Sequence, residues 1–232
     1  MGDLPARLRA EFLRLGAECS FARGNVIVAE GDRTTEVYVL LRGFVRIVNQ
    51  TAAGDQTMIA IRTTGDLVGE LAALDRVPRL STAIAASAVT ARVIDGAWFR
   101  AFTAEHPQVG EAVAQSVRAK FRTATRYRVA AGQASVLTRV ARVLAQLVDS
   151  YGRELSTGIL IDIPLPQHDV ASLVGAAEKS VARAYVQLRA AGVIRARYRE
   201  VLVPDVKLLH RYADGDADQP AIALTGSGGA RR

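Results

Sequence analysis

The chain contains 232 residues, of which 50% are hydrophobic and 23% are charged, and its formal net charge is +7. This length predicts one large domain or two small ones, and the apolar fraction is high enough for a sizeable core. The positive charge favours a polyanionic partner, and a nucleic acid is favoured over a membrane surface. A generally basic surface without such a partner would give the same net charge.

The residue inventory excludes several classes of protein. Cys19 is the single cysteine, so the sequence offers neither a disulfide framework nor a cysteine-rich metal site. His106, His168 and His210 are far apart and lack the spacing of metal ligands. No apolar stretch is long enough to span a membrane, and residues 1–14 mix charged and apolar residues instead of forming a signal peptide. A cytoplasmic protein without membrane attachment is therefore expected.

The N-terminal part changes from a helical pattern to a strand pattern. Leu4, Leu8 and Phe12 lie at helical spacing and predict a short amphipathic helix over residues 4–15. Between residues 21 and 94, apolar residues alternate with others in short runs separated by glycine-containing turns. Many short strands at regular spacing predict a closed or double-sheet β structure such as a jelly roll.

Residues 65–83, GDLVGELAALDRVPRLSTA, combine residue types that suit an anion site. Glu70 could accept a hydrogen bond from a sugar hydroxyl, and Arg79 could hold a phosphate through two charge-assisted hydrogen bonds. Ser81 and Thr82 add hydroxyl and N–H groups, and a glycine lets the backbone approach a ligand closely. The alternative is a surface turn that carries a Glu–Arg ion pair.

A long helix is predicted to begin at Pro107, after a short helix over residues 98–102. Its apolar residues repeat at helical spacing, at Val109, Val113, Val117 and Phe121. Such a seam is typical of a helix that dimerises in the manner of a coiled coil, of a helix that packs on its own β structure, or of one that does both. Gly132 interrupts the pattern and is the candidate hinge.

The C-terminal part has the pattern of a helix-turn-helix domain. Residues 136–148 predict an amphipathic helix with Ser135 as its N-cap. Residues 165–194 divide into helix, turn and helix, with Gly175 at the turn. Residues 194–203 then predict a short hairpin.

Two of these stretches carry a family resemblance. The order Gly69-Glu70-Leu71, a spacer, Pro78-Arg79 and then hydroxyl residues resembles the phosphate-binding cassette of cyclic-nucleotide-binding domains. Residues 165–194 resemble the helix-turn-helix of the Crp–Fnr superfamily. The whole chain is thus similar to Crp–Fnr transcription regulators, in particular to the cyclic-AMP receptor proteins of actinobacteria.

This resemblance implies an α+β fold in four parts. The expected parts are an N-terminal helix and β-roll, that is a jelly-roll cyclic-nucleotide-binding domain (residues 1–106), a long dimerisation helix (107–132), a C-terminal winged helix-turn-helix domain (133–213) and a disordered tail (214–232).

The resemblance also implies roles for individual residues. In the family the cassette glutamate binds the ribose 2′-hydroxyl and the cassette arginine binds the cyclic phosphate, which correspond to Glu70 and Arg79. Leu80 departs from the Thr or Ala often found after that arginine, and Ala124 stands where cyclic-AMP receptors commonly carry a Thr. The implied ligand-binding residues are Gly69, Glu70, Leu71, Arg79, Leu80, Ser81, Thr82, Thr123 and Thr125. The implied DNA-binding residues are Gln167, His168, Glu178, Lys179, Ser180 and Arg183.

The implied function is that of a sequence-specific DNA-binding transcription regulator. It would be a homodimer on a palindromic double-stranded operator, with cyclic AMP as allosteric ligand, no obligatory cofactor, and RNA polymerase as a further candidate partner. Two alternatives keep the fold: a regulator with a vestigial nucleotide site, and one that answers another effector such as a cyclic dinucleotide. An enzyme is not expected, because the sequence shows no nucleophile–base set, metal triad or Walker-type loop.

Overall fold

The computed structural model describes residues 4–51, 54, 56–130, 134–163, 165–197 and 200–216. Internal contacts divide the chain into two compact units. The first contains residues 1–132 and 163–178, and the second contains residues 133–162 and 179–232.

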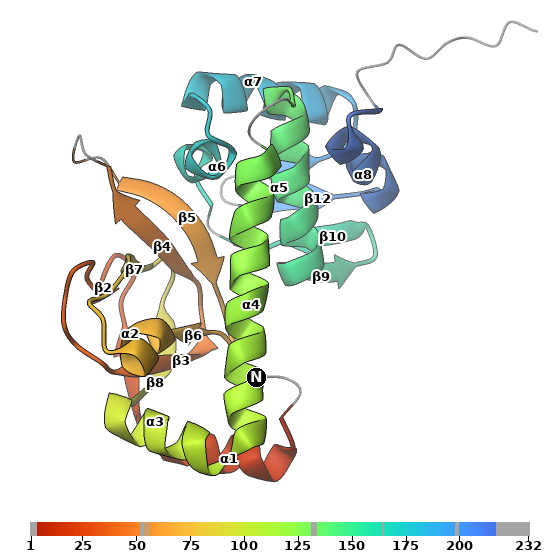
Figure 1. Ribbon diagram of the computed structural model, residues 1–232. Helices are drawn as coiled ribbons and strands as arrows, with labels where there is room; N and C mark the ends of the chain where they lie inside the picture. The colour runs from red at the N-terminus through yellow and green to blue at the C-terminus, as the bar shows by residue number, and fades with distance from the viewer. Residues whose placement is uncertain are drawn as a thin grey trace, which may run out of the picture. The chain divides into compact units, whose positions relative to one another are not determined.

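The first unit is built on two four-stranded antiparallel sheets (Figure 1). One has the strand order β1 (Ala17–Phe21), β8 (Val89–Ile94), β3 (Val37–Arg42) and β6 (Leu67–Val68). The other has the order β2 (Val26–Val28), β7 (Thr82–Ala85), β4 (Val45–Gln50) and β5 (Gln56–Arg62). The predicted double-sheet structure is confirmed, although β7 and β8, which follow each other in the chain, lie in different sheets.

Strand β3 shows how the sequence pattern builds two cores. Successive side chains of a strand point to opposite faces of the sheet. Leu40 packs with apolar residues of β2, β4, β6, β7 and β8 between the sheets, whereas Val37 and Val39 pack with the helices on the other face. One sheet is therefore covered on both sides, which fits the almost unbroken apolar run of this strand.

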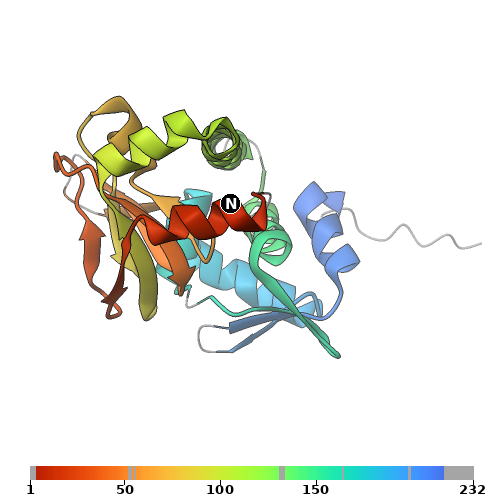
Figure 2. The same cartoon turned by 90° about the horizontal axis from the view of Figure 1, so that it is seen from below.

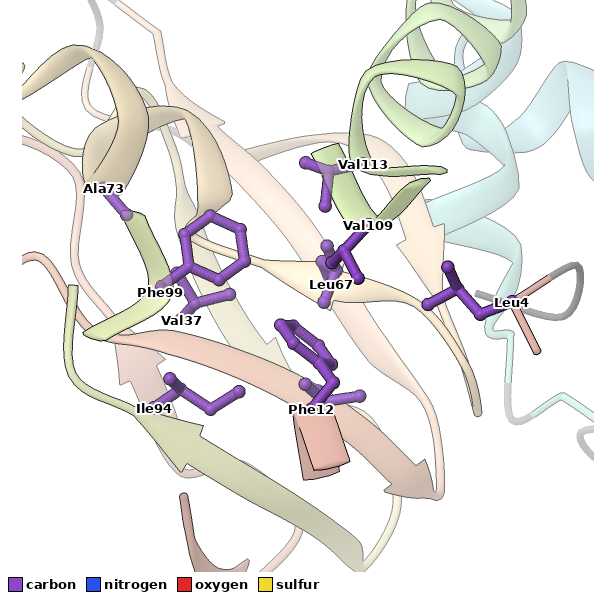
Figure 3. Close-up of a cluster of buried hydrophobic side chains, with 10 residues drawn as sticks. Leu4, Phe12, Val37, Leu67, Ala73, Ile94, Phe99, Val109 and Val113 are labelled. Atoms are coloured by element: carbon purple, nitrogen blue, oxygen red, sulfur yellow. The ribbon is translucent and has the colours of Figure 1, made fainter. Parts of the chain in front are cut away.

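The helical cover consists of α1 (Ala6–Arg14), α3 (Gly96–Glu105) and the start of α4 (Pro107–Ala130). Figure 2 shows α1, in red, beside the yellow-green α3 and α4. Phe12 of α1 is fully buried, with its ring centroid 6.0 Å from that of Phe99 and 5.7 Å from that of Phe102. Figure 3 shows Phe12 and Phe99 directed into one cluster with Leu67, Val109 and Val113. This cluster fixes the base of α4 to the β-roll.

The apolar seam of α4 has two different environments. Val109 and Val113 are 0% and 2% exposed in the cluster described above, whereas the side chain of Phe121 is 72% exposed. The periodicity left open whether this helix dimerises, packs on its own β structure, or does both. The first half of the helix packs on its own β structure. A charged residue at Val113 would disrupt this core instead of testing a contact between two copies of the chain.

Helix α6 (Gln167–Val174) belongs to the first unit by its contacts, which include β5. Arg46 Nη1 donates hydrogen bonds to both carboxylate oxygens of Asp169 at 2.9 and 3.0 Å. Asp169 is only 3% exposed. The ion pair therefore supplies the partner that a buried carboxylate requires.

The second unit contains a four-stranded antiparallel sheet with the strand order β11 (Arg195–Arg197), β12 (Glu200–Val203), β10 (Gly158–Ile161) and β9 (Gly152–Leu155) (Figure 1). Its helices are α5 (Val136–Tyr151), α7, which spans Glu178–Ala190 and starts at the unit boundary, and α8 (Val206–Asp214). Ser135 Oγ accepts a hydrogen bond from Thr138 N, which confirms the predicted N-cap. The predicted hairpin is confirmed as β11 and β12.

Two sequence predictions fall on residues that the structure does not describe. Gly132, the candidate hinge, lies outside the described residues, and so do residues 217–232 of the predicted tail. Among the described helices, none combines the length and the apolar character needed to cross a membrane.

Phe12→Ala tests the core beneath α4. Removing a fully buried aromatic ring leaves a cavity, so the variant should lose about 3–5 kcal/mol of unfolding free energy. Denaturant titration followed by circular dichroism measures the loss. Trp98→Ala, which removes a 64% exposed ring from α3, is the matched control and should change stability little. Equal losses for the two variants would contradict the packing described here.

Candidate functional site

The candidate site begins where β6 passes into α2 (Glu70–Asp75). Gly69 is the N-cap of this helix, with φ of 89°, a left-handed conformation that favours glycine. A Cβ atom at this position would also collide with Nη1 of Arg79. Gly69 therefore serves two purposes, because it makes the turn and leaves room for a guanidinium against the backbone.

The guanidinium of Arg79 is held by protein oxygens on all sides. Nε donates to Thr34 Oγ1 at 3.0 Å, Nη1 to Gly69 O at 3.1 Å, and Nη2 to Glu36 O at 2.8 Å. A carboxylate oxygen of Glu36 lies 3.4 Å from Nη2. Arg79 is only 3% exposed, and this burial lowers its pKa, an effect that the charge of Glu36 opposes. The result is a positive charge fixed in position.

Glu70 is the other buried charge of the cassette, with 5% of its surface exposed. Its Oε1 accepts a hydrogen bond of 2.6 Å from Lys120 Nζ of α4, which also donates to Leu67 O at 2.8 Å. Burial lowers the pKa of Lys120, and the adjacent Glu70 opposes that effect. The alternative of a surface Glu70–Arg79 ion pair is wrong, because both residues are buried and the ion pairs are Glu70–Lys120 and Arg79–Glu36.

These groups border a cavity of about 310 Å³, near the lower end of the usual size for small-molecule sites. Six residues of the predicted ligand set line it, namely Gly69, Glu70, Leu71, Arg79, Leu80 and Ser81. Thr82 does not line this cavity, and its hydroxyl accepts a hydrogen bond from Glu30 N at 3.0 Å. The side chains of Thr123 and Thr125 lie outside the described part of the structure.

Several lining residues were not predicted from the sequence. Val117, Lys120 and Phe121 come from one face of α4, and the others are Val28, Ile47, Ile59, Arg62, Leu67, Val68, Ala72 and Ala83. The helical spacing of Val117, Lys120 and Phe121 shows that they share a face. It does not show that Lys120 meets Glu70, because the two are separated by 50 positions in the sequence.

The arrangement suits the binding of a small organic anion. A fixed guanidinium can hold a phosphate or carboxylate, a carboxylate can accept from a hydroxyl, and apolar walls can enclose a ring. Within the described residues, no group of three or more His, Cys, Asp and Glu side chains could hold a metal ion.

The predicted DNA-binding residues lie at the starts of two helices. Gln167 and His168 are exposed in the first turn of α6, which ends at Gly175 in the left-handed conformation with φ of 61°. Glu178, Lys179 and Ser180 form the first turn of α7.

Helix α7 is amphipathic. Its buried residues are Val181, Ala184, Tyr185 and Leu188. Lys179 and Arg183 are exposed on the other face, and Arg183 Nη2 lies 3.4 Å from Ser180 Oγ. This face of α7 presents basic side chains near the N-terminus of the helix, as a helix that enters a DNA groove requires.

Comparison with known families gives two matches along the chain. Residues 18–106 match the cyclic nucleotide-binding domain, and residues 138–212 match the Crp-like helix-turn-helix domain. The first match contains the cavity residues of the cassette, and the second contains α7 and the hairpin.

Individual relatives are similar over most of their length. The chain is 28% identical over 193 residues to a CRP-like cAMP-activated global transcriptional regulator of Mycobacterium tuberculosis, covering 83% of this chain and 86% of the relative. FixK2 of Bradyrhizobium japonicum has a similar fold, with a TM-score of 0.75, 20% identity and coverage of 85% and 96%. The c-di-GMP responsive global regulator CLP of Xanthomonas campestris gives a TM-score of 0.72, 17% identity and coverage of 87% and 100%.

The two matched domains follow each other in this chain. Together with the cassette geometry and the basic face of α7, they show that the chain belongs to the CRP/FNR family of DNA-binding transcription regulators and carries its cyclic nucleotide-binding domain.

Proposed function

We propose that this regulator is a homodimer whose binding to DNA is controlled by a cyclic mononucleotide, with cyclic AMP as the first candidate. One observation carries the proposal: the buried Arg79 and Glu70 line the same cavity. Gly69, which has no side chain, leaves room for the guanidinium of Arg79. A phosphodiester on Arg79 and a ribose hydroxyl on Glu70 would use both groups.

The choice of a mononucleotide rests on charge and size. Glu70 and Lys120 neutralise each other, and two arginines also line the cavity. Arg62 is only partly buried and donates to Ile61 O at 2.7 Å, so the buried Arg79 is the candidate partner of one phosphodiester. A cavity of about 310 Å³ suits one nucleotide better than two. The M. tuberculosis relative is described as cAMP-activated, which supports cyclic AMP, whereas CLP is described as responsive to c-di-GMP.

One observation favours the alternative of a vestigial site. Every nitrogen of the Arg79 guanidinium already donates to a protein oxygen, and Glu36 supplies a counter-charge. A phosphate must therefore share or replace these contacts. Binding remains favourable in this account because Glu36 is 42% exposed and 3.4 Å away, so it neutralises the guanidinium only partly.

The roles proposed for the three segments follow their order in the chain. In this proposal residues 1–106 bind the nucleotide, residues 107–132 form the dimer and contribute Thr123 and Thr125 to the ligand, and residues 133–213 bind DNA. The exposed Phe121 supports the dimer, because a large apolar side chain 72% exposed on a long helix favours burial against a second copy.

Arg79→Leu tests the nucleotide site. The variant removes a charge-assisted contact worth about 1.5–3 kcal/mol, so affinity for cyclic AMP should fall at least about tenfold. Isothermal titration calorimetry measures the change, with Arg76→Gln as the control that removes an exposed positive charge from the same loop. Unchanged affinity in a folded Arg79→Leu protein would reject the phosphate role.

Phe121→Glu tests the dimer without touching the core beneath α4. Two glutamates brought together across a helix pair repel each other, so sedimentation velocity without nucleotide should show monomers. Trp98→Glu changes another exposed aromatic, 64% exposed on α3, and should stay dimeric. If Phe121→Glu also stays dimeric, the interface lies elsewhere.

Arg183→Ala tests the reading of bases by α7. An arginine at this point of a recognition helix can bind guanine O6 and N7. Its loss should cost about 1–3 kcal/mol and flatten the preference at one base pair of each half-site, with half-sites about one helical turn apart. Selection from a randomised operator measures this, and Arg189→Ala, an exposed arginine in the last turn of α7, is the control. Recovery of no palindrome by the parent protein would reject the two-fold operator.

A further inference from the structure

Arg62 is a cation of the cavity that has no role in the proposed function so far. It is the last residue of β5, and it lines the cavity together with Arg79 and Lys120. Each of those two cations has a carboxylate partner, Glu36 for Arg79 and Glu70 for Lys120. Within the described part of the chain, no carboxylate lies within ion-pair distance of Arg62, so its positive charge has no counter-charge there.

The guanidinium of Arg62 is held at one nitrogen and open at the other two. Nη1 donates to the carbonyl oxygen of the neighbouring Ile61 at 2.7 Å. Among the described residues, Nε and Nη2 have no acceptor, and neither nitrogen is sealed from solvent. A guanidinium presents its N–H groups side by side in a fixed plane. A ligand in the cavity can therefore accept two parallel hydrogen bonds from Arg62.

The charges that act on one another give the order of these groups along the cavity. Burial lowers the pKa of Arg79, and Glu70 is among the charges that oppose this effect. Burial also lowers the pKa of Lys120, where Glu70 opposes the effect and the positive charge of Arg62 adds to it. Glu70 thus neighbours both Arg79 and Lys120, and Arg62 neighbours Lys120. In a 3′,5′-cyclic nucleotide, C1′ carries the base next to the 2′-hydroxyl and away from the phosphate. With phosphate on Arg79 and ribose on Glu70, Arg62 lies toward the end of the cavity that receives the base.

We propose that Arg62 reads the base of the bound nucleotide and selects guanine. This inference rests on the proposed function, because it concerns the base of the cyclic mononucleotide that the cavity binds. Guanine presents two neighbouring acceptors, O6 and N7, which match the paired N–H groups of an arginine. Adenine presents N7 beside an amino group, so an arginine there meets a donor in place of the second acceptor. Cyclic GMP therefore binds more tightly than cyclic AMP.

The rest of the cavity fits a purine beside Arg62. Ile59 of the same strand and Val117 and Phe121 of α4 line the cavity with apolar side chains that can cover the faces of a ring. A second phosphate would also satisfy an arginine, but a cavity of about 310 Å³ leaves little room for one beside a nucleotide. Cyclic AMP still enters the site, because Arg79 and the carboxylate beside it act on the phosphate and ribose that both nucleotides share.

Arg62→Met is the test, because it keeps an unbranched side chain and removes the guanidinium. Isothermal titration calorimetry compares cyclic GMP, cyclic AMP and cyclic IMP, whose hypoxanthine keeps O6 and N7 of guanine but lacks its amino group. The parent should bind cyclic GMP and cyclic IMP at least about tenfold more tightly than cyclic AMP. In Arg62→Met this preference should fall to within about twofold, through weaker binding of cyclic GMP and cyclic IMP, while affinity for cyclic AMP changes little.

Two further variants complete the experiment. Arg42→Met is the matched control, since it removes an exposed arginine at the end of β3 that does not line the cavity. It should bind all three nucleotides as the parent does. Arg62→Gln places an amide at the position, and an amide matches N6 and N7 of adenine instead of the two acceptors of guanine. It should also lose the preference for cyclic GMP, and it replaces Arg62→Met if the latter does not fold by circular dichroism.

The outcomes separate this inference from the function on which it rests. If the parent binds no cyclic nucleotide, the proposed function fails and the inference fails with it. If the parent binds cyclic AMP at least as tightly as cyclic GMP, or if Arg62→Met keeps a preference for cyclic GMP, only the role of Arg62 is rejected. Equal weakening of all three nucleotides in Arg62→Met would reject that role too. So would weak binding of cyclic IMP by the parent, because O6 and N7 would then not be the groups that are read.

Discussion

The guanidinium of Arg79 is a cation buried in the first unit, and residues from other stretches of that unit satisfy it. A buried cation is costly unless hydrogen bonds and a counter-charge satisfy it. Thr34, Glu36 and Gly69 supply them from two stretches of chain that the sheets bring together. Gly69 must be a glycine for the guanidinium to fit. These contacts thus hold one positive charge of the cassette beside a cavity.

Helix α4 contacts both the β-roll and the cassette. Val109 and Val113 pack its first half against the β-roll. Farther along, Lys120 reaches back to Glu70 while Phe121 is largely exposed. In the proposed function, this helix, packed at one end and ion-paired to the cassette farther along, transmits small changes at the cassette.

The sequence predicted the parts of the site that are local in the chain. Glu70 and Arg79 stand in a short motif, the glycine before them marks a turn, and the Ser135 cap and the helix-turn-helix depend on residues a few positions apart. The double-sheet structure of the β-roll was predictable because many short alternating runs have few other ways to cover their apolar faces. Both charges line one cavity, and the anion site that the motif predicted stays a prediction.

The features that could not be predicted depend on contacts between residues that are far apart in the sequence. Periodicity showed that Val109, Val113 and Phe121 lie on one stripe, but it cannot show which part of a stripe is covered. Glu70 pairs with Lys120, which lies 50 positions away in the sequence. Arg79 pairs with Glu36, which lies 43 positions away. Helix α2 has only six residues, too few for a periodic signal. The placement of β7 and β8 in different sheets likewise depends on pairing with strands far away in the chain.

The central claim is that occupancy of the cavity and binding to DNA share one free energy of coupling. The direct measurement is a pair of titrations with the full-length protein: operator affinity with and without saturating cyclic AMP, and cyclic AMP affinity with and without saturating operator. Thermodynamic linkage requires the two factors to be equal, and we predict a common factor of about 5 to 150. Operator affinity that is the same with and without bound cyclic AMP would contradict the account.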